Sequence, residues 1–134
     1  MFFNKVIEYI GAKVTKKEGD RRADKQISKA SKNKKNGMVY VFELNSRYDI
    51  DGSYTHNTAR YINHSCDPNC EVEIIKNKIW IMSIKDIKKG QELSYNYGYT
   101  YDTDYKEHKC RCKSSKCIGY ILAEEHWRKL KKKR

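Results

Sequence analysis

The sequence contains little proline, little glycine and no long apolar run. One proline and seven glycines among 134 residues exclude collagen-like proteins and proline-rich stalks. No apolar stretch approaches the roughly 18–20 residues that a membrane span needs, and the first residues lack the basic and then apolar pattern of a signal peptide. With 38% hydrophobic and 34% charged residues, the composition instead indicates a globular chain of one domain's length with no membrane partner.

Acidic residues are also in the minority, with 17 Asp and Glu against 29 Lys and Arg, and the formal net charge is +12. The excess lies in two basic segments. Residues 13–35 hold ten Lys and Arg against three acids, and residues 126–134 hold six with no acid. Such segments are typical of contacts with nucleic acid or other polyanions, and a solvated surface is the ordinary alternative. The closing Lys-Leu-Lys-Lys-Lys-Arg is also typical of a nuclear-import signal.

The five cysteines are an odd number, which does not suit a secreted disulfide framework. Three of them, Cys110, Cys112 and Cys117, lie within eight residues, a spacing that allows one loop to wrap one metal ion. Zinc takes four thiolate or imidazole ligands in a tetrahedron. A fourth ligand must come from elsewhere, and the candidates are Cys66, Cys70 and His108. The alternative is a set of free thiols.

Short apolar stretches predict a mostly-β domain with many short strands and few helices. Strands are expected over residues 6–10, 39–44, 48–50 and 92–95, with a hairpin formed by 71–75 and 79–84. A helix is predicted through about Ala30 because Thr15 and Glu18 have capping-box spacing, although Gly19 lowers helix propensity. After a polar loop at 32–37, a basic terminal helix is predicted from about Tyr120, with one apolar side made of Ile121, Leu122, Trp127 and Leu130.

Two longer stretches carry a resemblance to a known family. Residues 57–70 read Asn-Thr-Ala-Arg-Tyr-Ile-Asn-His-Ser-Cys-Asp-Pro-Asn-Cys, and residues 90–99 read Gly-Gln-Glu-Leu-Ser-Tyr-Asn-Tyr-Gly-Tyr. They resemble the R-F/Y-I-N-H-S-C-x-P-N and E-L-T-Y/F-D-Y segments of SET-domain protein lysine methyltransferases. The three clustered cysteines and the following Ile-Gly resemble the post-SET motif C-x-C-x4-C-x-G, and residues 6–11 resemble the opening strand V-I-E-Y-x-G. Four pieces in the family's order make the resemblance specific, and it is closest to the branch that methylates histone tails.

The resemblance implies a SET-domain fold of several small sheets with a pseudo-knot, a post-SET zinc loop and a C-terminal helix. The implied boundaries are a SET domain over residues 1–105, a zinc motif over 106–121 and a basic tail or helix over 122–134. Family members carry a G-x-G-like turn and strands before the V-I-E-Y strand, which complete the cofactor pocket. Because Val6 lies close to the first residue, the resemblance also implies that these N-terminal strands are lacking here.

The implied reaction is methyl transfer from S-adenosyl-L-methionine to the ε-amine of a lysine in a histone or another protein. Tyr97 matches the catalytic tyrosine, and Tyr95 matches a position where a hydroxyl crowds the methylated product, which favours mono- or dimethylation. Asn63 and His64 match positions that hold the cofactor, largely through backbone and amide contacts. Arg60 and Tyr40 match positions that line the cofactor or lysine channel.

For zinc, the family pattern implies the ligand set Cys66, Cys110, Cys112 and Cys117, which leaves Cys70 spare. The zinc would be structural. The implied partners are a histone tail and nucleosomal DNA along the basic segments, and the location is the nucleus or chromatin of the protein's own cell or of a host. A basic tail should meet local acid, for which Glu43, Asp49 and Asp51 are candidates. The alternatives are an inactive SET-like module that binds chromatin or nucleic acid, and an unrelated zinc-dependent RNA-binding protein.

Overall fold

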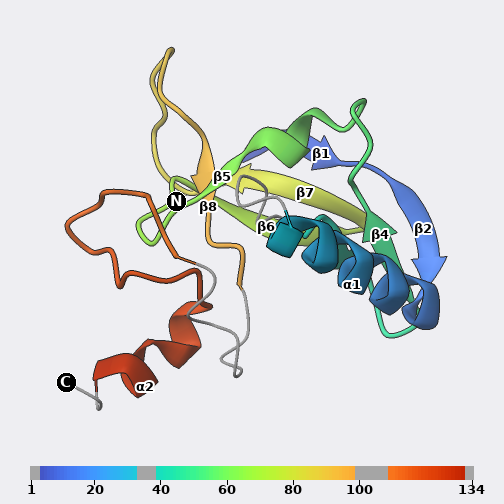
Figure 1. Cartoon of the computed structure of the whole chain (residues 1–134). Coiled ribbons are helices and arrows are strands. Elements are labelled where there is room, and N and C mark those ends of the chain that lie inside the picture. Colours follow the sequence, from blue (N-terminus) through green and yellow to red (C-terminus); the bar gives the residue numbers. More distant parts are fainter. Residues whose placement is uncertain (1–3, 33–38, 99–108, 132–134) are drawn as a thin grey trace. The chain divides into compact units, whose positions relative to one another are not determined.

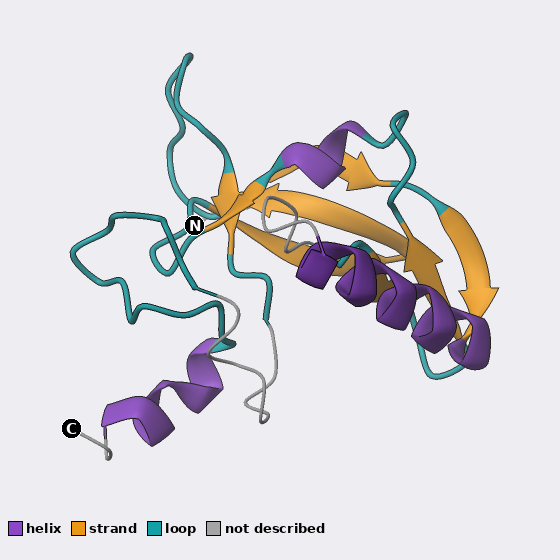
Figure 2. Ribbon diagram, in the orientation of Figure 1, coloured by secondary structure: helices purple, strands orange, loops and turns teal. Residues whose placement is uncertain are grey.

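The computed structural model describes residues 4–32, 39–98 and 109–131, and in this part of the chain short strands form three small sheets (Figures 1 and 2). The first sheet has the strand order β1-β7-β6, with β1 Asn4–Tyr9, β7 Lys78–Ser83 and β6 Cys70–Ile75. The second has the order β2-β4-β3, with β2 Ala12–Thr15, β4 Tyr48–Asp51 and β3 Val41–Glu43. The third pairs β5 Asn63–His64 with β8 Ser94–Tyr95.

Helices are few, as expected. The described α-helices are α1 Lys16–Lys32 and α2 Trp127–Lys131, and 3-10 turns cover η1 Thr58–Tyr61 and η3 Glu124–His126. The prediction of a mostly-β fold is therefore confirmed. None of the helices in the described ranges has the length and apolarity that crossing a membrane requires.

The contacts divide the chain into two compact units, and neither is one continuous stretch of sequence. We call Lys5–Tyr61 with Val72–Met82 the helical unit, because it contains α1. We call Met1–Asn4, Ile62–Glu71 and Ser83–Arg134 the cysteine unit, because it contains all five cysteines. The boundaries predicted at residues 105 and 121 both fall inside the cysteine unit and stay predictions.

The hairpin of β6 and β7 closes as its sequence predicts. Its two turn residues, Lys76 and Asn77, have φ angles of 50° and 62°. Positive φ at both central residues is the geometry of a type I′ turn, which matches the natural twist of paired strands. On β7 the side chains of Ile79 and Ile81 are 1% and 0% exposed, so this strand supplies the core of the first sheet.

Helix α1 begins where the capping-box spacing predicts. The backbone N–H of Glu18 donates to Thr15 Oγ1 at 3.3 Å, which satisfies one of the open donors of the first turn. The strand before it, β2, was not anticipated. Its register with β4 pairs Ala12 with Asp51 and Thr15 with Tyr48, so the strand leads directly into the helix.

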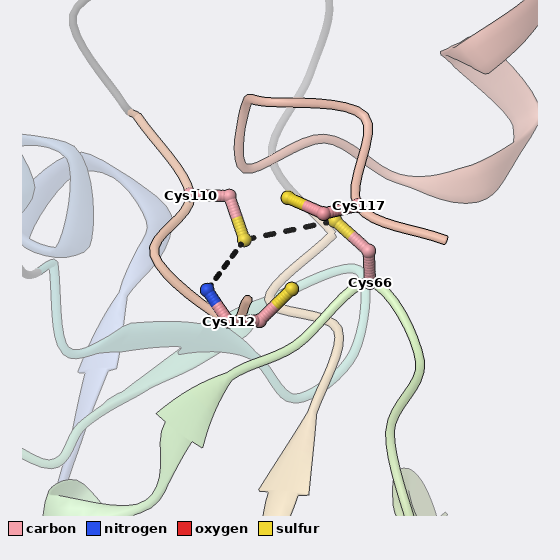
Figure 3. A group of neighbouring side chains, drawn as sticks. All are labelled: Cys66, Cys110, Cys112 and Cys117. Carbon is pink, nitrogen blue, oxygen red and sulfur yellow. Dashed lines mark hydrogen bonds between the residues drawn. The ribbon is translucent and has the colours of Figure 1, made fainter. Parts of the chain in front are cut away.

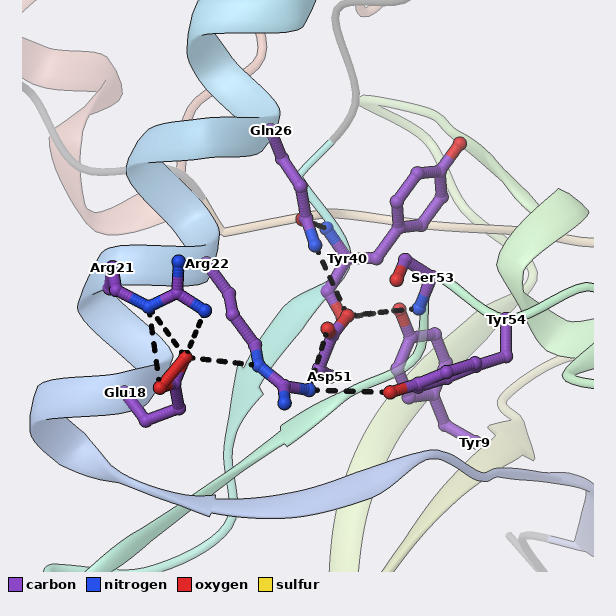
Figure 4. A network of polar contacts seen from close by, with 9 residues as sticks. All are labelled: Tyr9, Glu18, Arg21, Arg22, Gln26, Tyr40, Asp51, Ser53 and Tyr54. Atoms are coloured by element: carbon purple, nitrogen blue, oxygen red, sulfur yellow. Dashed lines mark hydrogen bonds and ion pairs between the residues drawn. The ribbon is translucent and has the colours of Figure 1, made fainter.

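Polar contacts join α1 to the second sheet (Figure 4). Arg22 Nη1 donates to Asp51 Oδ2 at 3.2 Å, and Gln26 Nε2 donates to Asp51 Oδ1 at 3.1 Å. Gln26 also accepts the backbone N–H of Tyr40 at 2.8 Å. Burial alone would raise the pKa of Asp51, but hydrogen bonds from Ser53, Gln26 and Arg22 outweigh it and hold that pKa below its usual value. The carboxylate is therefore a fixed anchor for the helix.

Gly19 lies where α1 approaches β4 most closely, which explains a residue that propensity disfavours. A side-chain Cβ at this position would overlap Asp49 Oδ2 and lie 3.0 Å from Asp49 Cβ. Asp49 cannot easily move away, because it is 7% exposed and its Oδ1 accepts a hydrogen bond from Lys16 Nζ at 2.6 Å. The helix therefore needs glycine for packing rather than for backbone freedom.

We expect Gly19→Ala to destabilise the protein by about 1–3 kcal/mol, the usual cost of overpacking. At an exposed helical site the same change would instead stabilise by roughly 0.5–1 kcal/mol. Urea unfolding compares the wild type, Gly19→Ala and Lys17→Ala, an exposed position of the same helix where truncation to alanine should change the unfolding free energy by less than about 0.5 kcal/mol. An unchanged or higher unfolding free energy for Gly19→Ala would contradict the close packing against Asp49.

The predicted start of the terminal helix is wrong. Tyr120 forms an isolated antiparallel bridge with Lys109, and helical structure begins only with η3 and α2. Leu122 is 0% exposed, and its carbonyl accepts hydrogen bonds from Asn96 Nδ2 at 3.0 Å and Trp127 Nε1 at 3.2 Å. Because these side chains use the carbonyl that a helix would need, the apolar spacing around Leu122 reflects docking of an extended segment.

Candidate active site and metal centre

Parallel pairing of β5 and β8 brings the two long motifs together in the cysteine unit. Asn63 is opposite Ser94 and His64 is opposite Tyr95. The backbone N–H of Ser65 continues the ladder to the carbonyl of Tyr95 at 3.1 Å. The structure thus describes the pairing of the two motif strands. That the chain forms a pseudo-knot here stays a prediction.

Tyr97 is held at both its hydroxyl and its backbone. The hydroxyl donates to the carbonyl of Ile62, and the backbone N–H donates to Nδ1 of His64 at 3.1 Å. Its ring centroid lies 4.9 Å from that of Tyr95, which is 4% exposed. Because its proton is directed at Ile62, the oxygen of this hydroxyl can act toward a further partner only as an acceptor.

His64 is buried, and burial lowers its pKa to about 4. The imidazole is therefore neutral near pH 7. Its ring lies edge-on to Tyr97, with centroids 5.4 Å apart and an interplanar angle of 69°. The two residues predicted to hold the cofactor therefore differ in exposure, because His64 is buried whereas Asn63 is exposed at the start of the same strand.

Two residues that support these motifs, Glu92 and Asn69, were not predicted. Asn63 Nδ2 donates to Glu92 Oε1 at 2.6 Å. Asn69 donates through Nδ2 to the carbonyl of Glu92 at 2.9 Å and accepts the backbone N–H of Ser94 at 2.9 Å. Both lie within the motifs, but their roles depend on pairing across more than twenty residues, which no local pattern reveals.

Arg60 and Tyr40, the other predicted pocket residues, meet in the helical unit. The Arg60 guanidinium lies 4.6 Å from the ring centroid of Tyr40 and 5.2 Å from that of Tyr61, which is cation–π geometry. Its Nη1 donates to the carbonyl of Ser53 at 2.5 Å. Its Nε is buried and has no hydrogen-bond partner among the described residues. The site therefore contains an orphaned donor between aromatic faces.

Two of the acids expected to face a basic substrate are engaged inside the helical unit. Asp49 pairs with Lys16 at 2.6 Å and Asp51 pairs with Arg22 at 3.2 Å. Glu43 lies 3.4 Å from Lys16 but keeps a carboxylate side chain that is 73% exposed. The expectation is therefore corrected for Asp49 and Asp51, whose charges anchor α1, while Glu43 stays a candidate.

Four cysteines gather in the cysteine unit (Figure 3). The sulfur atoms of Cys66, Cys110, Cys112 and Cys117 all lie within 4.8 Å of one another, and Cys66 Sγ is 3.7 Å from Cys110 Sγ. Four thiolates around a tetrahedral zinc, with bonds of about 2.3 Å, would lie about 3.8 Å apart. The donor set and spacing therefore fit zinc.

Among the described residues, Cys66 is the candidate for the fourth ligand that joins the three clustered cysteines. Cys70 is buried in β6 and does not belong to the cluster. His108 lies outside the described residues. Backbone amides support two of the sulfurs, because Cys112 N–H donates to Cys110 Sγ and Gly119 N–H donates to Cys117 Sγ, each at 3.4 Å.

Burial disfavours the thiolate form of two cysteines in the cluster. Burial raises the pKa of Cys66 to about 11, and it also raises the pKa of Cys110. For Cys112 the effect of burial is outweighed by hydrogen bonds from the backbone of Cys66 and Ser114 and from neighbouring thiols, and its pKa falls to about 6. A bound cation would stabilise every thiolate in such a group.

The fold and site define a small β protein in which a tyrosine-bearing strand pairs with an Asn-His strand beside a four-thiol cluster. The family model named "SET domain" matches residues 3–98. The chain therefore belongs to the SET-domain family.

Its relatives include human "Histone-lysine N-methyltransferase 2D", which is 37% identical over 120 residues covering 87% of this chain and 2% of the relative. "Histone-lysine N-methyltransferase ASHH2" of Arabidopsis thaliana is also 37% identical, with 87% of this chain and 6% of the relative covered. "Histone-lysine N-methyltransferase, H3 lysine-4 specific" of Emericella nidulans is 33% identical over 121 residues, covering 87% and 10%. The chain thus spans a small part of these relatives' length.

A solved structure gives the same result for the fold. It is described as "Structural basis for the product specificity of histone lysine methyltransferases" and matches with a TM-score of 0.64 and 28% sequence identity. The match covers 90% of this chain and 49% of the other. The expected family, and with it the SET-domain fold class, is confirmed.

Proposed function

We propose that the chain catalyses methyl transfer from S-adenosylmethionine to the ε-amine of a lysine in a histone tail. The observation that carries the proposal is the placement of Tyr97, whose hydroxyl and backbone are both fixed beside the buried ring of Tyr95. A module that only binds chromatin has no chemical need for an acceptor hydroxyl held in this way. The names of the relatives support the same reaction and substrate class.

The reaction is an in-line displacement at a methyl carbon by a neutral amine. A lysine amine has a pKa near about 10.4 in water and must lose a proton before it can attack. An aromatic, desolvated channel disfavours the ammonium form. Tyr97, as an acceptor, orients the amine, so that alignment rather than a general base supplies much of the rate. When bound, S-adenosylmethionine supplies the methyl group on a cationic sulfur.

The residues expected to hold the cofactor fit a polar ligand. The exposed Asn63 carboxamide is fixed by Glu92 and has further hydrogen-bonding capacity. In the helical unit, the buried Nε of Arg60 would be satisfied by an acceptor of a bound ligand, next to the ring of Tyr40. The zinc ligands would be the four clustered cysteines, and the zinc would fold the segment that follows Lys109.

Product specificity is proposed to depend on Tyr95. Its side chain is 4% exposed and packs against Tyr97, so a hydroxyl here takes space that additional methyl groups on the product amine would need. We therefore propose mono- or dimethylation as the main outcome.

Tyr95→Phe should shift the products toward trimethyllysine with little loss of the first methyl transfer. Removing the hydroxyl enlarges the channel without changing the aromatic packing, and such a swap usually costs less than about 1.5 kcal/mol of stability. Mass spectrometry of a histone H3 tail peptide after exhaustive reaction counts the methyl groups. An identical product distribution for wild type and Tyr95→Phe would contradict this assignment.

The substrate is proposed to be histone H3, because relatives named as H3 lysine-4 specific match over 87% of the chain. The basic segments 13–35 and 126–134 are proposed to contact nucleosomal DNA by charge. Both proposals place the protein at chromatin, in the nucleus of its own cell or of a host.

The test is transfer of labelled methyl from S-adenosylmethionine to mixed core histones, combined with calorimetric titration of S-adenosylhomocysteine. We expect label on H3, and we expect Asn63→Ala to weaken ligand binding by about tenfold, the loss of one or two hydrogen bonds. Lys89→Ala, at an exposed turn, is the matched control and should behave like the wild type. Absence of both label and ligand binding in a folded, zinc-loaded chain would overturn the proposal in favour of a binding module.

A further inference from the structure

The imidazole of His64 connects Tyr97, which follows β8, to the cysteine cluster. Its Nδ1 accepts the backbone N–H of Tyr97 at 3.1 Å, and its Nε2 lies 3.6 Å from the Sγ of Cys66. His64 is 9% exposed and Cys66 is 4% exposed, so the ring is enclosed between these two partners. A cofactor contact through the backbone of His64 would use neither ring nitrogen.

The hydrogen bond from Tyr97 determines which ring nitrogen carries the proton. A backbone N–H can only donate, so Nδ1 must offer its lone pair and the single proton of the neutral ring must lie on Nε2. The Nε2–H group is therefore the donor and Cys66 Sγ the acceptor. A thiolate accepts such a bond more strongly than a neutral thiol does, and hydrogen bonds to metal ligands orient them and tune metal affinity.

We propose that His64 is a positioning residue that links the zinc ligand Cys66 to the backbone of Tyr97. One side of the ring stabilises the Cys66 thiolate, and the other fixes the backbone of the residue whose hydroxyl is held by Ile62. Assembly of the metal site thus also sets the position of Tyr97. The kinetic part of this proposal rests on the proposed function, whereas the metal-binding part does not.

Two amide variants separate the two sides of the ring. The carboxamide of His64→Asn lies near the former Nδ1 position, so it keeps an acceptor for Tyr97 and loses the donor to Cys66. The longer His64→Gln places its amide near the former Nε2 position, so it keeps a donor to Cys66 and loses the acceptor for Tyr97. Both side chains are polar and smaller than or similar to imidazole, and thermal unfolding of the zinc-loaded chains checks that both variants fold.

Zinc affinity is measured on the full chain by competition with a chelator of known affinity. We expect a loss of about 10–100-fold for His64→Asn and near-wild-type affinity for His64→Gln. With cobalt(II) in place of zinc, the thiolate-to-cobalt absorption bands should shift for His64→Asn and stay in place for His64→Gln. In the methyl-transfer assay, His64→Gln should lower kcat while KM for histone is unchanged, because only the position of Tyr97 is affected.

Equal zinc affinity in wild type and both variants would overturn the link to Cys66. An equal loss in both variants would also overturn it, because a merely structural histidine predicts no difference between the two amides. If the wild type binds zinc but transfers no methyl group, the proposed function fails, while the affinity and cobalt measurements still decide the role of His64.

Discussion

Removal of zinc from the four-cysteine cluster should disrupt the segment from Lys109 to Leu122 and abolish methyl transfer. This segment contains few regular elements. Its described backbone contacts within itself are an isolated bridge between Lys109 and Tyr120 and hydrogen bonds from Cys110 to Gly119 and from Cys117 to Ser114. Structural zinc sites contribute apparent binding free energies of about 10–16 kcal/mol, which is comparable to the entire stability of a small domain, about 5–15 kcal/mol. Without the metal, burial of Cys66 and Cys110 favours neutral thiols, and no cation then holds the four sulfur atoms together.

The loss of order should extend to Tyr95 at the end of β8 and to Tyr97. Leu122 follows the cluster, and its carbonyl binds the side chain of Asn96, the residue between Tyr95 and Tyr97. Trp127 donates to the same carbonyl at 3.2 Å. A zinc loop that unfolds would release Leu122 and therefore the backbone on both sides of Asn96, so that the aromatic positions lose their alignment.

Cys112→Ser tests this prediction together with chelation, and Cys70→Ala is the matched control. Cys70 is buried outside the cluster, so its truncation should cost only about 1 kcal/mol for the small cavity and leave one zinc per chain. Elemental analysis, thermal unfolding and methyl transfer should show loss of zinc, of stability and of activity together in Cys112→Ser. Full activity in a chain shown to hold no metal would contradict a structural zinc.

The local features of the fold were predictable because their causes are local. The start of α1 follows from the hydroxyl of Thr15, which caps the N–H of Glu18. The hairpin turn follows from Lys76 and Asn77, which adopt positive φ. Gly19 shows the limit of such reasoning, because the sequence counts it against the helix while its cause is the approach to Asp49 on a distant strand. The predicted start of the terminal helix near Tyr120 was wrong for the same kind of reason, since Leu122 is used in tertiary docking and helix α2 begins only at Trp127.

The candidate site was predictable where a sequence motif contains its residues. It was not predictable where contacts between distant segments bring residues together. Spacing alone picked out three members of the cysteine cluster. The resemblance was needed to select Cys66 among the candidates for the fourth, because it lies 44 residues before Cys110. The partners of Asn63 and Tyr97 are a side chain on Glu92 and a backbone carbonyl on Ile62. Every residue has a backbone carbonyl, so no sequence pattern marks the contact that orients the Tyr97 hydroxyl.

Tyr97→Phe should reduce kcat by about 10²-fold or more while the protein stays folded. The change removes an acceptor that aligns the amine, and loss of alignment in a displacement reaction has effects of about this size. Its structural cost is one hydrogen bond to Ile62, about 0.5–1.5 kcal/mol. The ring stays against Tyr95 and the backbone N–H stays on His64, so the zinc site and cofactor affinity should be unchanged.

The matched control for Tyr97→Phe is Tyr54→Phe, which also removes one bonded hydroxyl. Tyr54 is 40% exposed, and its hydroxyl accepts a hydrogen bond from Arg22 at 3.3 Å in the helical unit. Both variants should lose similar, small amounts of stability, whereas only Tyr97→Phe should lose kcat, with KM for histone close to wild type. A similar kcat in both variants would mean that the hydroxyl of Tyr97 serves the fold alone, and alignment of the amine would then have to come from another group.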